Sequence, residues 1–101
     1  MRVVLSERVE QELKRHFSYG VDKFGKMVAE RTFGRVRRFL FESLAAYPRI
    51  GVYRSRHDVF EAVVPRTPFV AFYRIDDASA TLTVVAFFHH AQDRDAEWGK
   101  R

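Results

Sequence analysis

Several features are missing from this chain of 101 residues, and each absence excludes a class of protein. There is no cysteine, which excludes a disulfide framework and thiolate metal sites and agrees with a reducing compartment. No stretch approaches the roughly 20 apolar residues that a membrane-spanning helix needs. The short apolar run at residues 3–5 is followed at once by charge, which does not fit a signal peptide. We therefore expect a single domain over residues 1–101, acting in the cytoplasm without membrane contact.

The motifs of several common enzyme classes are also missing. No glycine-rich loop is present to hold phosphates, and no serine lies in the elbow motif of a hydrolase. His89 and His90 resemble metal ligands, but neighbouring residues on a strand point to opposite faces unless the strand has already ended. We therefore predict neither a metal site nor a cofactor.

The residues that are present suit a folded basic protein. Hydrophobic residues make up 47% of the chain and include ten phenylalanines, enough for an apolar core. The net charge is +5, and the basic excess lies in the first three quarters of the sequence. A positive field favours nucleic acid, an acidic protein or an anionic surface, and the charge alone does not choose among them.

The first half of the chain has helical periodicity. Ser6 is a suitable N-cap, Val9, Leu13 and Phe17 recur with helical spacing, and Gly20 is a plausible stop. We expect Asp22 to cap a second helix that runs to Tyr47, with a kink or break near Gly25 or Gly34. Two helices with so short a connection predict an antiparallel hairpin. The expected buried face of the second helix is Phe24, Met27 or Val28, Val36, Phe39, Leu40 and Leu44.

Two phenylalanines do not fit this helical face. Phe33 and Phe41 fall outside the expected apolar stripe of the second helix. Either the phase of the helix is misread, or these side chains belong to an apolar surface that a partner covers.

After Pro48 the period changes to that of strands. Residues 60–64, 69–75 and 82–89 read as three strands separated by turn residues. The last of these is nearly continuously apolar, which indicates a strand inside the sheet that is buried on both faces. The predicted fold class is α+β, with an N-terminal strand and a helical hairpin packed on an antiparallel sheet of three to four strands.

Three segments in this order resemble the RelE/ParE superfamily of type II toxin–antitoxin toxins, and the ParE (plasmid stabilisation) branch in particular. They are FESLAAYPRIG at residues 41–51, FVAFYRI at 69–75 and TVVAFFHHAQDRD at 83–95. The order and spacing of the three segments, together with the chain length, carry the resemblance. The resemblance covers nearly the whole chain.

The resemblance implies a toxin that acts inside the cell and is neutralised by a cognate antitoxin, which we expect to be acidic and partly disordered. ParE-like proteins poison DNA gyrase, whereas RelE-like proteins cut messenger RNA on the ribosome. The nuclease branch carries lysine and arginine on its sheet and a tyrosine or histidine near the C-terminus. Here residues 60–64 hold no basic side chain, and Val70 stands where that branch usually has arginine. The comparison favours a ParE-like protein that binds a macromolecule. RelE-like mRNA cleavage and a non-toxic basic RNA- or protein-binding module are the alternatives.

Several cationic and aromatic residues are candidates for contact with the target. Arg94 matches the closing arginine of the family pattern, and Arg74 lies in the matching strand, while His89 and Trp98 are substitutes for a terminal tyrosine. Arg54 and Arg56 alternate with Tyr53 and His57, which suits nucleic-acid binding but equally an exposed loop. A further basic group on the second helix is either a partner surface or a solvated face; it consists of Arg35, Arg37 and Arg38.

Overall fold

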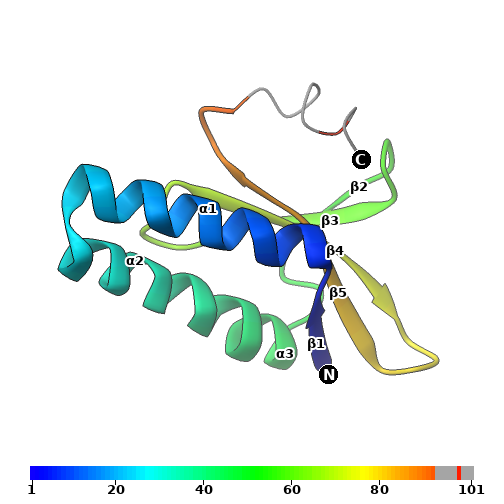
Figure 1. The fold of residues 1–101 in the computed structure, drawn as a ribbon. Helices are drawn as coiled ribbons and strands as arrows, with labels where there is room; N and C mark the ends of the chain where they lie inside the picture. Colours follow the sequence, from blue (N-terminus) through cyan, green and yellow to red (C-terminus); the bar gives the residue numbers. More distant parts are fainter. Residues whose placement is uncertain (93–97, 99–101) are drawn as a thin grey trace.

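The computed structural model describes residues 1–92 and Trp98, and its helices cover one face of a five-stranded sheet (Figure 1). In chain order the elements are β1 (Arg2–Leu5), α1 (Glu7–Phe24), α2 (Lys26–Arg38), the π-helix η1 (Phe39–Ser43), α3 (Leu44–Ala46), β2 (Val52–Arg54), β3 (Val59–Val63), β4 (Phe69–Asp76) and β5 (Thr81–His89). This arrangement confirms the predicted α+β class.

The sheet has the strand order β1-β5-β4-β3-β2. Strands β2 to β5 pair antiparallel in succession, whereas β1 pairs parallel with β5, so the sheet is mixed and has five strands in place of the expected three or four. The parallel pair arises because the chain crosses over through the helices between β1 and the rest of the sheet. Strand β2 escaped prediction because all of its residues are exposed, which leaves no alternation of buried and exposed positions.

The helical hairpin turns at Gly25 and not at Gly20. Ser6 caps α1 as expected, since its hydroxyl accepts a hydrogen bond from the Val9 amide at 3.2 Å. Helix α1 continues through Gly20 and Asp22 to Phe24, so the predicted stop and the predicted cap are both wrong. Gly25 has φ +90° and ψ 159°, a conformation that side chains with a Cβ rarely adopt, and this ends the helix.

The second helical segment runs through α2, η1 and α3 toward the sheet. Its buried face includes Val36, Phe39, Leu40 and Leu44, as predicted. The π-helical turn lets Phe39 and Leu40 both reach the core before Leu44, whose amide bonds to the Phe39 carbonyl. The expected burial of three other residues is wrong, because they lie at the turn of the hairpin and are exposed; these are Phe24, Met27 and Val28.

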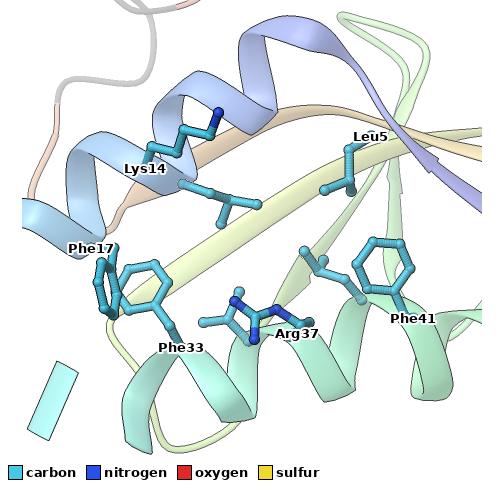
Figure 2. Close-up of a pocket in the computed structure, with 9 residues that line it drawn as sticks. Leu5, Lys14, Phe17, Phe33, Arg37 and Phe41 are labelled. Carbon is cyan, nitrogen blue, oxygen red and sulfur yellow. The ribbon is translucent and has the colours of Figure 1, made fainter. Parts of the chain in front are cut away.

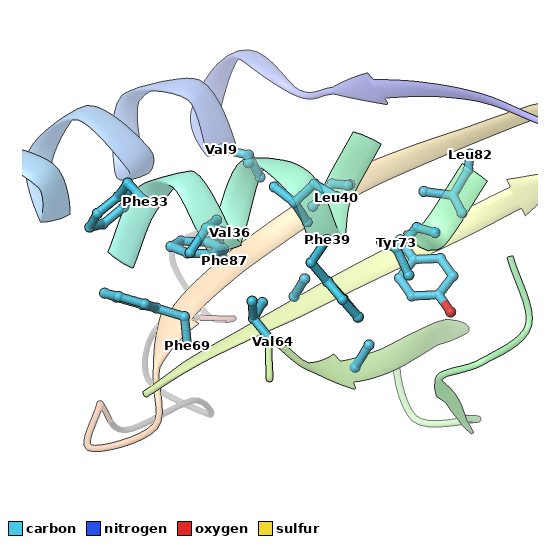
Figure 3. Close-up of a cluster of buried hydrophobic side chains, with 14 residues drawn as sticks. Val9, Phe33, Val36, Phe39, Leu40, Val64, Phe69, Tyr73, Leu82 and Phe87 are labelled. Atoms are coloured by element: carbon cyan, nitrogen blue, oxygen red, sulfur yellow. The ribbon is translucent and has the colours of Figure 1, made fainter. Parts of the chain in front are cut away.

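The main core lies between the helices and the sheet (Figure 3). Phe87 of β5 is fully buried, and its ring stacks on Phe69 of β4 with centroids 4.9 Å apart. From the helical side, the ring of Phe33 contacts Phe69 at 5.3 Å. These aromatic contacts tie α2 to β4 and β5, two of the three inner strands.

A β-bulge in β5 explains its nearly continuous apolar sequence. Phe72 pairs with Ala86 and Tyr73 pairs with Val84, so Val85 is the extra residue. The bulge changes the phase of the strand, and Val84 and Phe87 therefore both face the helices. The prediction of an inner strand that is buried on both faces is confirmed.

Candidate functional site

The face of the sheet opposite the helices, here called the far face, has an apolar centre. It carries a second buried cluster, which consists of Val59, Val70, Phe72, Ala86 and Phe88. Trp98 packs against this cluster, and its ring lies 5.3 Å from Phe72 and 5.9 Å from Phe88, edge to face in both cases. The centre of the far face is therefore apolar and holds the side chain of Trp98, and it is bordered by Arg74, on the face of Phe72, and by Arg54, on the face of Val59.

Trp98 also joins the turn between β2 and β3. Its ring stacks on that of His57 with centroids 4.4 Å apart and an interplanar angle of 15°. In the same turn, the Tyr53 hydroxyl donates a hydrogen bond to Asp58 at 2.7 Å, and this bond raises the pKa of Tyr53. The predicted site residue Trp98 is thus packed between the far-face cluster and the turn.

Three of the predicted arginines lie around the same turn. Arg74 donates two hydrogen bonds to backbone carbonyls, to His57 at 2.9 Å and to Asp58 at 3.2 Å. Arg54 belongs to β2 and not to a loop, and its Nε lies 3.0 Å from Glu61 Oε1. Arg56 is exposed within the turn. The guanidinium groups of Arg74 and Arg54 are therefore engaged within the protein, while Arg94 lies outside the described residues.

His89 lies elsewhere, on the helical side of the sheet where β5 ends. Its ring contacts Phe69 edge to face at 5.5 Å, and its Nδ1 accepts a hydrogen bond from the Ala91 amide at 3.1 Å. Because the strand has ended, the rings of His89 and His90 stack at 4.8 Å. Within residues 1–92, no three possible ligands come together to hold a metal ion. The structure therefore separates His89 from Arg54, Arg56 and Arg74.

We expect stability to fall as the pH drops below about 6.5 in part because of His89. Burial, and secondarily the charge of His90, lower the pKa of His89 from its ordinary value of 6.5. In this window the unfolded chain binds the proton more readily than the folded chain, so protonation favours unfolding, and stability returns as the pH rises. Urea unfolding of the wild type and His89→Gln at pH 5 to 8 checks this. A variant with an unchanged pH slope would contradict it.

A second candidate surface is a groove between α1 and α2, here called the interhelical groove (Figure 2). It has a volume of about 220 Å³. Its floor is apolar and consists of Leu5, Leu13, Phe17, Phe33, Val36, Leu40 and Phe41. Lys14 of α1 and Arg37 of α2 add a cation from each helix. The groove thus combines an apolar floor with positive charge on both sides.

The groove resolves the question of the two misplaced phenylalanines. Phe33 is buried and packs edge to face on Phe17 at 5.7 Å, so its position reflects a misread helix phase. Phe41 is 44% exposed and lines the groove, which fits the alternative of a surface that a partner covers. Sequence reasoning missed Lys14, and the local signal for this surface was Phe41, which stands outside the expected helical stripe.

A comparison with models of protein families matches residues 3–94 to the ParE toxin of the type II toxin–antitoxin system, parDE. The chain belongs to the ParE toxin family. Membership in this family makes it the toxin of a type II toxin–antitoxin pair, with a cognate antitoxin as partner. No match was found among curated proteins.

Two further observations accompany this ParE family assignment. In the described part of the chain, no helix is long and apolar enough to cross a membrane.

The glycine of the first motif segment, Gly51, donates its amide to the Tyr73 hydroxyl at 3.0 Å and leaves no room for a side chain. The motif residue thus ties the helix exit to β4, the strand of the second motif.

Proposed function

We propose that the protein is a ParE-like toxin that acts in the cytoplasm by binding and poisoning DNA gyrase. The observation that carries this proposal is the apolar cluster at the centre of the far face. Cleavage of RNA needs cations that stabilise charge developing on the phosphate, together with groups that move protons. In this protein the far face instead packs Phe72 and Phe88 against Trp98. A surface of this kind favours binding over cleavage.

The arginines of the β2–β3 turn support the same choice. Arg74 donates to two backbone carbonyls and Arg54 pairs with Glu61, so both guanidinium groups already have partners within the protein. Among the predicted target contacts, we propose Arg56, because it lies in the exposed turn, and Arg94, because it matches the closing family pattern.

Purified protein and induced cells distinguish these activities. A gyrase poison is expected to inhibit supercoiling by purified gyrase, to retain gyrase in a pull-down, and to cause filamentation with DNA-damage signalling. The variant Arg94→Ala is expected to weaken these effects. Cleaved messages with normal supercoiling would replace the proposal with RelE-like mRNA cleavage, and neither effect would favour the non-toxic binding module.

We further propose that the antitoxin places an acidic, partly disordered segment in the interhelical groove. The apolar floor offers a place for hydrophobic anchors, and Lys14 and Arg37 attract carboxylates. Phe41 is the most suitable anchor contact because it is large and 44% exposed in the unbound protein. Binding of this kind matches both the charge and the apolar character of the surface.

The variant Phe41→Glu is expected to weaken antitoxin binding about tenfold to hundredfold, because it puts a negative charge where an acidic segment would bind. Calorimetry with the antitoxin encoded by the neighbouring reading frame measures this change. The matched control is Val63→Glu, which adds the same charge at an exposed position of β3 that does not line the groove. Equal loss in both variants, or none in Phe41→Glu, would contradict the docking site.

A further inference from the structure

The outward face of α2 carries a row of arginines that the proposed function does not use. Arg31, Arg35 and Arg38 recur at i, i+4 and i+7, so they lie along one side of the helix. The core-facing side is different and includes Ala29, Phe33 and Val36. We call the row Arg31, Arg35 and Arg38 the arginine stripe. It places three cations on the side of α2 that faces away from the sheet.

Within the part of the chain that the structure describes, the arginines of the stripe form no ion pair with a carboxylate. Lys26 pairs with Glu30 on the same helix at 3.8 Å, but no described carboxylate lies within ion-pair distance of the three stripe arginines. Glu42, four residues after Arg38, makes no such pair either. Like charges at i, i+4 destabilise a helix by mutual repulsion. A polyanion on this face would relieve that repulsion.

Gly34 lies within the stripe, at i+3 from Arg31. A glycine inside a helix is less favourable than alanine. A Cβ at this position would meet only the Arg38 guanidinium, at an ordinary contact distance of 3.8 Å. Packing inside the protein therefore does not require glycine here, whereas a glycine does allow a ligand to approach the helix backbone closely.

We propose that the arginine stripe binds the phosphate backbone of double-stranded DNA. The positions that share this face from Arg31 to Arg38 are arginine, glycine, arginine and arginine, with no apolar or aromatic side chain among them. A protein partner would be expected to bury apolar anchors at the centre of its interface. A single-stranded nucleic acid would be expected to stack its bases on aromatic side chains. A duplex needs only the positive charge.

The dimensions of the stripe agree with this ligand. With a rise of 1.5 Å per residue, Arg31 and Arg38 lie about 10 Å apart along the helix axis. One strand of duplex DNA presents a phosphate about every 3.4 Å along its axis, so this length spans about three phosphates. The binding does not depend on gyrase inhibition or on the antitoxin, and it is measured without either.

Fluorescence anisotropy with a labelled 20-bp duplex of mixed sequence tests the proposal. Three phosphate contacts add about −2.7 to the slope of log K against log salt, or about a 40-fold loss of affinity between 50 and 200 mM salt. The triple variant R31Q/R35Q/R38Q is expected to lose that part of the slope and to bind at least tenfold more weakly at 100 mM salt. Circular dichroism and thermal unfolding verify that it is folded.

The matched control is R2Q/K23Q/R66Q, which removes the same charge from exposed positions on β1, at the end of α1 and between β3 and β4. We expect this variant to retain the wild-type slope to within about one unit. Equal losses in the two triple variants would overturn the proposal, because net charge alone would then explain binding. Binding of single-stranded RNA or of a polyglutamate peptide as tightly as the duplex would also overturn it.

Discussion

Replacing Phe87 with alanine is expected to lower the free energy of unfolding by about 3–5 kcal/mol. Phe87 is fully buried in β5, and its ring stacks on Phe69 at 4.9 Å and meets His16 edge to face at 6.0 Å. Truncation removes these contacts and leaves a cavity between the sheet and the helices that neighbouring side chains fill only in part. Urea denaturation followed by circular dichroism measures the loss.

The exposed Phe24 provides the control for this experiment. Phe24 is 62% exposed at the hairpin turn, so Phe24→Ala is expected to change stability by no more than about 0.5 kcal/mol. Similar losses for the two substitutions would show that Phe87 is not at the centre of the core.

The second large effect is expected at Gly51, where Gly51→Ala should cost about 2–4 kcal/mol. A Cβ here would lie 2.8 Å from the Glu61 carbonyl oxygen and 2.8 Å from the Tyr73 hydroxyl. One obstacle is backbone and the other belongs to a fully buried side chain, so neither moves freely. The shift would also strain the hydrogen bond from the Gly51 amide to Tyr73. Thermal unfolding of the purified variant measures the effect.

Gly34 is the matched control for Gly51. Its position in α2 accepts a Cβ without a clash, so Gly34→Ala is expected to stabilise the protein by up to about 1 kcal/mol. Opposite signs at the two glycines are the expected result. Stabilisation by Gly51→Ala would mean that the loop after α3 does not approach β3 as closely as described here.

The strands after β2 were predictable within about one residue, because their periodicity and the flanking turn residues are local signals. The end of α1 could not be predicted in this way. Gly20 and Gly25 are equivalent in helix propensity, but Gly20 packs near Ala29 of α2 while Gly25 adopts a positive φ. Which glycine breaks the helix depends on the contact between the two helices, and local sequence does not contain that contact.

The candidate sites show the same division. Arg54 and Arg56 are visible in the sequence as one cationic segment, whereas the partners of Arg74 are carbonyls 16 and 17 residues away in the chain. The interhelical groove draws its lining from β1, α1, α2 and η1, and no single segment reveals it. The position of Phe41 outside the helical stripe was the one local indication of this surface.

By itself, the order of apolar, polar and turn residues determined the α+β class, the helical hairpin and the kinship to ParE toxins, because these depend on periodicity and on motifs that are local in the chain. Only the tertiary structure decided which charges are engaged and which are available. Arg74 donates hydrogen bonds to carbonyls of a turn that is distant in the sequence. Arg31, Arg35 and Arg38 instead lie along the outer face of α2. The reason is that a charge is satisfied by neighbours in space, and packing brings those neighbours together from separate parts of the sequence.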